Sequence, residues 1–275
     1  GYASTQGAAE LGVPVAGVQH HHAHIAACMA ENGLEGPVLG IAWDGTGLGP
    51  DGAIWGGEFL ACTRAELRRA AWLRPFPLVG GDAAAREPRR AALGVLREMG
   101  SAHRPPGFTD AELAVMDGML AGGIQVVRTS SAGRLFDAVA SLLGVCQKMT
   151  HEGQAAMRLE ALAGDAPAEP YPFGWRNAAL DWAPMVAEIL RGAEAPAAAA
   201  ARFQATLAEM MVAAARREKR EDVCLSGGCF QNRRLLAEAT RRLAAEGFRV
   251  WRHREIPPND AGICLGQLAV AAARA

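Results

Sequence analysis

Residues 37–60, PVLGIAWDGTGLGPDGAIWGGEFL, decide the fold. The run from Pro37 to Trp43 is apolar throughout and has the length of a buried strand, and Ala53 to Leu60 resumes a strand pattern. Between them stands Asp44-Gly45-Thr46-Gly47, whose glycines let backbone N–H groups approach an anion and whose threonine hydroxyl adds a donor. The stretch predicts a hairpin with a phosphate-binding tip. Glycine-rich hairpins are common, so the motif alone does not identify a ligand.

A cluster of histidines precedes this hairpin. Residues 13–18 are a short apolar run that predicts a strand, and they lead into His20-His21-His22-Ala23-His24 at the start of a helix that extends to residue 32. His20 and His24 are four residues apart, so their imidazoles project from one helix face, as two ligands of one metal ion would. His21 and His22 point elsewhere. The alternative is a solvated or helix-capping cluster, but four of the seven histidines within five residues favour a metal site.

Two aspartates are candidates for the remaining metal ligands. A divalent cation needs more than two neutral ligands, and carboxylates suit a hard or borderline metal. Asp44 stands at a strand end before glycines, and Asp260 stands where Pro257-Pro258-Asn259-Asp260 caps the last helix. Each is equally compatible with a turn aspartate or an N-cap aspartate. Histidine and aspartate sites accept several metals, of which we expect iron or zinc.

The remaining elements alternate between strand and helix at both ends of the chain, with a mainly helical stretch between them. In chain order we expect a strand at 67–78, a helix opened by Gly80-Gly81-Asp82 and ending near Met99, mainly helices over 108–220 with a proline-rich loop at 166–173, a strand at 222–225, a tight turn at 226–228, a helix at 229–246, a strand at 248–251 and the final helix after residue 260. This order predicts an α/β fold.

Several further residues have the chemistry of a ligand site. Ser226-Gly227-Gly228, between a strand and a helix, is a second candidate phosphate cradle. Asp137 and Glu152 are positioned to accept ribose hydroxyls, although Arg134 and Arg158 are equally available to form structural ion pairs with them. Arg86 could hold a carboxylate-like or carbamoyl group through its planar guanidinium, but a solvated helix arginine fits the pattern no less well.

Composition excludes several classes of function. The 275 residues are 50% hydrophobic, enough for a sizeable core, and the formal net charge of −1 offers no basic stripe, so we do not expect a nucleic acid as the main partner. The six cysteines are scattered without metal-knuckle spacing and indicate free thiols in a reducing compartment. No apolar stretch is long enough to span a membrane, and we expect a cytoplasmic protein.

The order of these motifs resembles the Kae1-like module of the HypF carbamoyltransferases, over nearly the whole chain. The segments that carry the resemblance are Val18-Gln19-His20-His21-His22-Ala23-His24, Asp44-Gly45-Thr46-Gly47, Gly80-Gly81-Asp82, Gly133-Arg134-Leu135-Phe136-Asp137, Glu152-Gly153-Gln154-Ala155-Ala156-Met157, Ser226-Gly227-Gly228-Cys229-Phe230-Gln231-Asn232 and Asn259-Asp260-Ala261-Gly262-Ile263. More distant relatives are tRNA threonylcarbamoyl-transfer proteins and antibiotic O-carbamoyltransferases.

The resemblance implies a two-lobed actin/hexokinase/Hsp70-like (ribonuclease H-like) α/β fold. We expect an N-terminal lobe at 1–107, with its first strands missing from the chain, and a C-terminal lobe at 108–275. The resemblance implies one divalent metal held by His20, His24, Asp44 and Asp260, with Arg86 added to the catalytic set. For ATP or carbamoyl-adenylate it implies contacts with Asp44, Gly45, Thr46, Gly47, Gly133, Asp137, Glu152, Gly153, Ser226, Gly227, Gly228 and Asn232.

The activity implied is carbamoyl transfer from carbamoyl-adenylate to the C-terminal cysteine of HypE, a step toward the cyanide ligands of NiFe hydrogenase. Upstream HypF modules would make the adenylate from carbamoyl phosphate and ATP, and we expect this chain to work with them. Two alternatives stay open. In the first, the chain transfers a carbamoyl group to a small hydroxyl compound or a threonylcarbamoyl group to tRNA. In the second, it is a non-catalytic nucleotide-binding docking module. The spacing of His20 and His24 argues against the latter.

Overall fold

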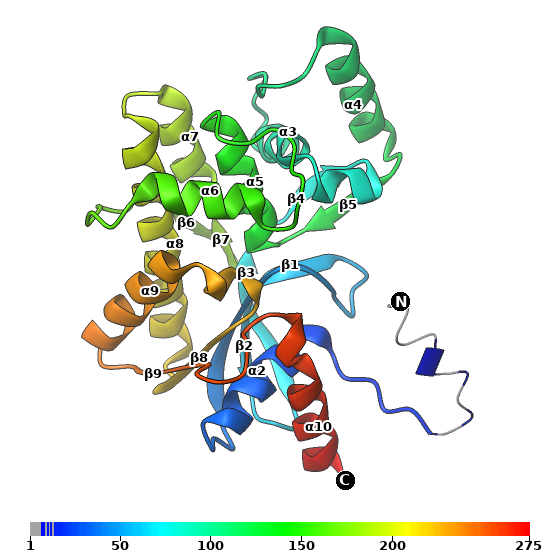
Figure 1. Ribbon diagram of the computed structural model, residues 1–275, viewed down its shortest axis with the longest axis vertical. Coiled ribbons are helices and arrows are strands. Elements are labelled where there is room, and N and C mark those ends of the chain that lie inside the picture. Colours follow the sequence, from blue (N-terminus) through cyan, green and yellow to red (C-terminus); the bar gives the residue numbers. More distant parts are fainter. Residues whose placement is uncertain (1–6, 9, 11, 13) are drawn as a thin grey trace.

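A mixed β-sheet forms the centre of the protein. The computed structural model describes residues 7, 8, 10, 12 and 14–275, and within them the sheet has nine strands. Its main path runs β6-β7-β3-β2-β1-β8-β9, with β4 and β5 paired beside β2 (Figure 1). The strands are β1 (Val38–Leu48), β2 (Ile54–Cys62), β3 (Leu67–Leu73), β4 (Phe76–Val79), β5 (Val126–Thr129), β6 (Gly174–Arg176), β7 (Ala179–Asp181), β8 (Asp222–Ser226) and β9 (Arg249–Arg252).

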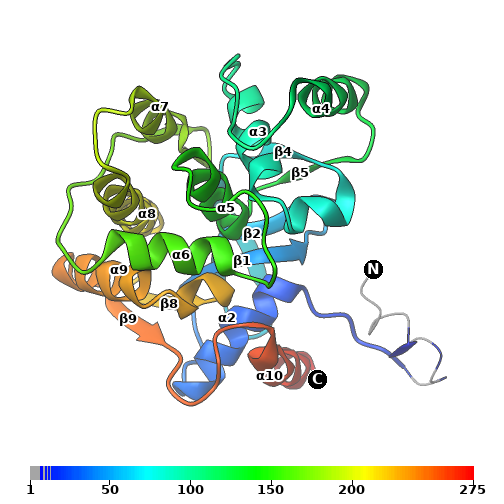
Figure 2. The same cartoon turned by 45° about the horizontal axis from the view of Figure 1, so that its top comes forward.

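Helices cover both faces of this sheet. They are α2 (His20–Glu31), α3 (Pro88–Glu98), α4 (Asp110–Gly122), α5 (Ala132–Leu142), α6 (Gln154–Ala163), α7 (Ala183–Arg191), α8 (Pro196–Glu218), α9 (Arg233–Ala245) and α10 (Ile263–Arg274), with short 3₁₀ turns η1 (Gly81–Ala85), η2 (Gly228–Gln231) and η3 (Asp260–Gly262). In Figure 2, α2 and α10 lie together apart from the larger group formed by α5 to α9. Among the described residues, every helix is too short or too polar to cross a membrane.

Strand β1 is buried on both faces, which explains its continuous apolar sequence. Leu39, Ile41 and Trp43 face the large core that includes α5 and α8, whereas Ala42 belongs to the smaller core under α2. A Cβ at Gly40 would lie 2.5 Å from the side chain of Ile25, so the missing side chain lets α2 pack directly on the strand. This packing fixes the height of the histidine helix above the sheet.

Three neighbouring strands run parallel toward the same edge of the sheet. β1 pairs with β8 in parallel, with Ala42 opposite Ser226, and β8 pairs in parallel with β9, with Leu225 opposite Arg252. The carboxyl ends of parallel strands are where α/β folds bind ligands. The irregular stretch of β1 at Asp44, the loop after Ser226 and the loop after Arg252 therefore open onto one region.

Most of the predicted elements are confirmed. The hairpin is formed by β1 and β2 as antiparallel neighbours, but the tip expected at residues 44–49 is wrong. β1 continues to Leu48 and the turn spans Gly49–Ala53, so Asp44 lies within β1, where a register shift between Trp43 and Gly47 leaves residues 44–46 outside the ladder. The histidine helix, the strand that begins at Asp222 and the final helix also form. β8 pairs with β1, and β9 with β8, so one sheet crosses the predicted lobe boundary at residue 107, and the boundary itself stays a prediction.

The strand predicted at 13–18 is wrong for the residues that the structure describes. Val13 lies outside them, and residues 14–18 have no strand assignment and are largely exposed, with half of the Val15 side-chain surface accessible. An apolar run becomes a strand only where a neighbouring strand supplies hydrogen-bond partners, and these residues are assigned no partner strand.

The other corrections come from proline and from short strands. The strand predicted at 67–78 is two strands, because the chain breaks at Arg74-Pro75 and a proline donates no ladder hydrogen bond. The helix predicted from residue 80 begins as η1, and α3 begins only at Pro88, a residue suited to the first helical turn. The helix predicted from Cys229 likewise begins as η2. The stretch at 108–220 contains β5, β6 and β7, which are too short to show a period.

Two helical glycines give a matched test of this packing. A Cβ at Gly266 in α10 would clash with the carbonyl oxygen of Ala23 in α2, whereas a Cβ at Gly118 in α4 would meet no atom within 4 Å. We expect Gly266→Ala to lower the free energy of unfolding by about 1–3 kcal/mol through overpacking. Gly118→Ala should raise it by about 0.5–1 kcal/mol, because alanine is the better helix former. Urea unfolding measures both changes, and a stabilising Gly266→Ala would contradict the close approach of the two helices.

Candidate metal centre and nucleotide site

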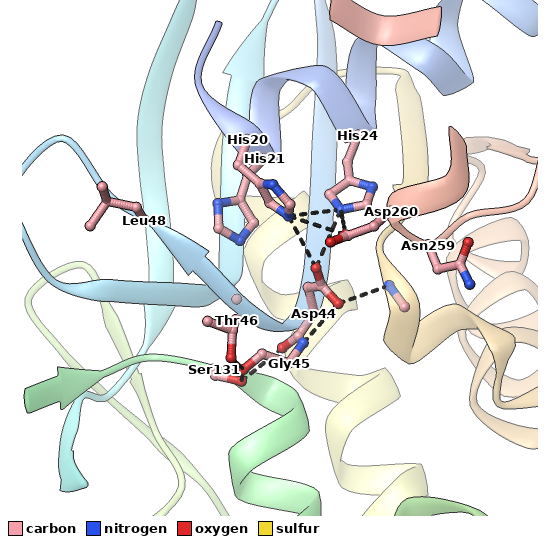
Figure 3. A network of polar contacts seen from close by, with 12 residues as sticks. His20, His21, His24, Asp44, Gly45, Thr46, Leu48, Ser131, Asn259 and Asp260 are labelled. Carbon is pink, nitrogen blue, oxygen red and sulfur yellow. Dashed lines mark hydrogen bonds and ion pairs between the residues drawn. The ribbon is translucent and has the colours of Figure 1, made fainter. Parts of the chain in front are cut away.

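Four ligand-type side chains from three separate segments meet at the sheet edge (Figure 3). His20 Nε2 lies 3.2 Å from Asp44 Oδ2 and 3.4 Å from Asp260 Oδ1, and His24 Nε2 lies 3.3 Å and 3.4 Å from the same two oxygens. The two Nε2 atoms are 3.2 Å apart. The structure thus brings together the four residues that we expected to hold a metal.

These separations fit a bound divalent ion. Metal–ligand bonds of roughly 2.0–2.1 Å put neighbouring ligand atoms of a tetrahedral ion about 3.3–3.4 Å apart. The five separations above span 3.2–3.4 Å, and all four ligand atoms lie within 4.8 Å of one another. Two imidazole nitrogens with two carboxylate oxygens suit zinc, iron and similar ions. The residues present therefore fit the expected metal.

Without a cation, the four groups hold one another by charge. Burial lowers the pKa of His20, but hydrogen bonds with Asp260 and Asp44 outweigh it and raise this pKa to about 9. The pKa of His24 is also raised, against the effect of burial, by the same two carboxylates. Hydrogen bonds with the histidines hold the pKa of Asp44 well below its usual range although burial opposes this. The largely buried Asp44 carboxylate and the more exposed Asp260 carboxylate both lie against the histidines, and their negative charges need positive charge, which protons or a metal ion supply.

Backbone groups fix the orientation of Asp44. Its Oδ1 accepts hydrogen bonds from the N–H groups of Gly45 (2.8 Å) and Gly228 (3.3 Å), which leaves Oδ2 for the histidines. The Ser131 hydroxyl donates to the carbonyl oxygen of Asp44 (2.7 Å) and, as the N-cap of α5, accepts from the N–H of Arg134. The carboxylate is thus held from both the hairpin and the Gly228 loop.

Glycines let three backbone segments touch around this turn. A Cβ at Gly133 would lie 2.8 Å from the Cα of Gly45, one at Gly56 would lie 2.5 Å from the Asp44 carbonyl oxygen, and one at Gly227 would clash with Trp43. Side chains at these positions would push apart the hairpin, the start of α5 and the loop after β8. The expected phosphate-binding segments are therefore brought together, and their contact requires glycine.

The first turn of α2 aims the histidines in different directions. Gln19 caps the helix by accepting from the N–H of His22, and its amide nitrogen lies 3.1 Å from His21 Nδ1. The ring of His22 contacts the carbonyl oxygen of Thr63 through Nε2 (2.9 Å), away from the site. His21 Nε2 is buried without a hydrogen-bond partner among the described residues. His21 and His22 are thus outside the four-residue cluster.

The nucleotide-site residues have mixed surroundings. Asp137 is buried, which raises its pKa to about 6, and its Oδ2 lies 2.9 Å from Arg134 Nη1, so the ion pair considered for it exists. Arg134 also donates to the carbonyl oxygen of Ala85 (3.2 Å), which links α5 to η1. Asn232 caps α9, and its Nδ2 is buried without a partner within the described chain.

Other residues expected in the nucleotide or catalytic site either form hydrogen bonds within the protein or have exposed side chains. The Ser226 hydroxyl lies 2.8 Å from His253 Nε2, and the N–H of Gly227 donates to the Pro258 carbonyl oxygen. Arg86 and Glu152 have exposed side chains with no recorded contact to the four-residue cluster in the described part of the chain. Thr46 is exposed in the irregular stretch of β1, where its hydroxyl donates to the Gly45 carbonyl oxygen.

A cavity that the sequence did not indicate lies beside these loops. It has a volume of about 660 Å³, between α6 and the start of α9, and is lined by Met157, Glu160, Ala161, Gly164, Asp165, Arg233, Arg234 and Ala237. The Glu160 carboxylate accepts from the N–H groups of Arg233 (2.8 Å) and Arg234 (3.3 Å). Because these arginines directly follow Asn232, the cavity adjoins the expected nucleotide-binding residues. Its walls come from α6 and α9, which are far apart in the sequence, so no local sequence pattern predicts the cavity.

Comparisons with known proteins identify the family of this chain. Residues 40–267 match the family model described as carbamoyltransferase, Kae1-like domain, second subdomain, and residues 1–31 match the HypF Kae1-like domain. Carbamoyltransferase HypF of Rhodobacter capsulatus is 45% identical over 99% of this chain and 38% of its own length. A carbamoyltransferase HypF homolog of Cupriavidus necator is 44% identical over 96% of this chain and 73% of its own length.

A solved structure shares the fold. The crystal structure of full-length HypF in the phosphate- and nucleotide-bound form superposes with a TM-score of 0.87 at 36% identity, covering 98% of this chain and 45% of that one. The predicted α/β fold of the two-lobed Kae1-like type is thereby confirmed. The chain spans well under half the length of full-length HypF, and it belongs to the HypF carbamoyltransferase family as a C-terminal Kae1-like module.

Proposed function

We propose that this module transfers a carbamoyl group from carbamoyl-adenylate to the C-terminal cysteine of a HypE-type acceptor protein. The observation that carries the proposal is the meeting of His20, His24, Asp44 and Asp260 beside glycine loops suited to phosphate. Family membership supports carbamoyl transfer as the reaction, and the similar full-length HypF structure is a phosphate- and nucleotide-bound form. Formation of the adenylate from carbamoyl phosphate and ATP is assigned to upstream modules of the longer relatives.

Within this reaction, the four-residue cluster would hold one divalent ion. Such an ion, when bound, supplies Lewis-acid polarisation of a carbamoyl or phosphate oxygen and a template for the two reacting molecules. The protein fixes the cluster in advance, because Asp44 is oriented by two backbone N–H groups and the histidines by α2. Preorganised charge of this kind needs no rearrangement during the reaction.

The nucleotide is assigned to the adjoining loops and cavity. Its phosphate would lie near the Asp44–Gly47 turn and Gly133, where the Arg134 guanidinium adds positive charge. Its nucleoside would extend past Asn232 toward the cavity between α6 and α9, whose volume lies in the range of small-molecule pockets. The buried Nδ2 of Asn232 is a donor available to this ligand.

The transfer exchanges a C–O bond for a C–S bond. The acceptor thiol releases its proton to solvent, the thiolate electron pair attacks the carbamoyl carbon, and the bond from that carbon to the phosphate oxygen breaks, releasing AMP. The electron pair of the broken bond leaves on the phosphate, where the positive charge of Arg134 stabilises it. Water must be excluded because it competes with the thiol for the same carbon.

Metal binding can be tested directly. The chain should bind one Zn²⁺ or Fe²⁺ ion, and His20→Ala should weaken binding by more than about 100-fold, because it removes a ligand rather than a supporting group. His151→Ala is the matched control, since this histidine is exposed and outside the cluster. Chelator competition gives the affinities. Equal binding by wild type and His20→Ala would eliminate the proposed centre.

The pH dependence of metal affinity follows from the raised histidine pKa values. In the metal-free protein His20 keeps its proton up to pH about 9, and that proton must leave before Nε2 can bind a metal. Between pH 6.5 and 9 the affinity should therefore rise about tenfold per pH unit for each protonated imidazole. The raised pKa of His20 also stabilises the metal-free fold, by a contribution that is fully present below its unfolded value of 6.5 and is lost as the pH rises through about 9.

Calorimetry in buffers of different ionisation enthalpy counts the protons released on metal binding. We expect at least one proton at pH 7. Release of none, with an affinity that does not change between pH 6.5 and 9, would show that the histidines are already neutral and would contradict this charge state.

The acceptor is tested by supplying the chain with carbamoyl-adenylate and a HypE-type protein. Mass spectrometry should find one carbamoyl group on the C-terminal cysteine of that protein, and none on a variant that lacks this cysteine. His24→Ala should reduce the transfer by more than about 100-fold, which corresponds to losing roughly 3 kcal/mol of transition-state stabilisation. Carbamoylation of a sugar hydroxyl instead would refute the proposed acceptor while leaving the transferase function standing.

A further inference from the structure

The far end of the histidine helix holds the segment that carries Asp260. Glu31 is the last residue of α2, eleven residues after His20 and so about 16 Å along the helix. Its Oε1 accepts hydrogen bonds from the backbone N–H groups of Arg254 (2.9 Å), Glu255 (2.6 Å) and Ile256 (3.3 Å). Three consecutive amides on one carboxylate oxygen fix the start of the segment that leads to Asp260.

The other oxygen of Glu31 reaches the glycine loop through a histidine. Glu31 Oε2 lies 3.0 Å from His253 Nδ1, and His253 Nε2 lies 2.8 Å from the Ser226 hydroxyl. The carboxylate is only an acceptor, so Nδ1 carries the proton, and the Nε2 lone pair of the neutral ring accepts from Ser226. Both pKa directions agree with this assignment: burial lowers the pKa of His253, and hydrogen bonds to the carboxylate lower that of Glu31 although burial opposes them. The Ser226 hydroxyl proton is thus committed to His253.

Both segments continue directly into the metal centre. The loop after Ser226 supplies the Gly228 N–H to Asp44, and Gly227 donates to the carbonyl oxygen of Pro258, two residues before Asp260. A Cβ at Gly262 would clash with the carbonyl oxygen of Pro257, so the segment folds tightly onto η3. Glu31 therefore contacts the segment that leads to Asp260. Through His253 it also contacts the loop after Ser226, which orients Asp44.

We propose that Glu31, acting with His253, is a positioning residue that aligns Asp260 and Asp44 with the two histidines of the same helix. The proposal rests on the metal centre proposed above. One helix then provides two ligands at its first turns and sets the positions of the other two from its last residue. Supporting groups of this kind typically change metal affinity about 10–100-fold when they are removed.

The test compares Co²⁺ binding and the visible absorption of bound Co²⁺ in four proteins: wild type, Glu31→Ala, Glu31→Gln and Glu255→Gln. Glu31→Ala should weaken Co²⁺ binding by about 10–100-fold and shift the absorption bands. Glu31→Gln should have an intermediate affinity, because its amide oxygen still accepts the three N–H groups. Its NH₂ group would, however, face Nδ1 and reverse the hydrogen bond between His253 and Ser226. Glu255→Gln removes an exposed charge from the same segment and should bind like wild type.

The outcomes separate the possible failures. If Glu31→Ala binds Co²⁺ with wild-type affinity and absorption, the proposal is overturned. A lower thermal midpoint of the metal-free Glu31→Ala protein together with unchanged Co²⁺ binding would also overturn it, because Glu31 would then have only a structural role. Should Glu31→Ala fail to fold, Glu31→Gln and His253→Ala decide by the same two readouts. Absence of Co²⁺ binding by wild type would instead refute the metal centre, and the role of Glu31 with it.

Discussion

The contact between two imidazoles and two carboxylates, just beyond the point where β1 and β8 stop pairing, is the interaction on which the rest of the site depends. Asp44 and Asp260 are separated by more than two hundred residues, and their negative charges repel at this range unless positive charge lies between them. Protonated histidines supply it in the metal-free protein, and a divalent ion would supply it in the working one. Holding the four groups together costs free energy, because the carboxylates repel each other and lose water. A bound cation would offset this cost by neutralising the carboxylates.

Backbone packing makes this convergence possible. The parallel pairing of β1, β8 and β9 puts three strand ends side by side, and glycines at 56, 133, 227 and 228 let the following loops approach within backbone contact. Gly266 has the corresponding role between α10 and α2. A ligand with both a phosphate and a reactive carbonyl group needs backbone donors and a cation within a few ångströms of each other. The proposed adenylate site and the metal centre are adjacent for this reason.

The sequence predicted those parts of the site whose signal is local. The spacing of His20 and His24 on one helix face, the aspartate after the apolar run of β1 and the aspartate at the start of the last helix can each be recognised within a few residues. Their convergence could be expected only from the family resemblance, because no spacing rule connects Asp260 with residue 20. The strand wrongly predicted at 13–18 shows the same limit, since strand formation depends on a partner elsewhere in the chain. Glu31 and His253 gave no signal because they act on each other across 222 residues.

The central claim is that one cation binds between His20, His24, Asp44 and Asp260, and anomalous diffraction from crystals grown with Zn²⁺ tests it most directly. Data collected on either side of the zinc absorption edge should give one strong anomalous peak about 2.0–2.2 Å from each of the four ligand atoms. A peak elsewhere on the protein, or none at this cluster in a protein with bound zinc, would contradict the account.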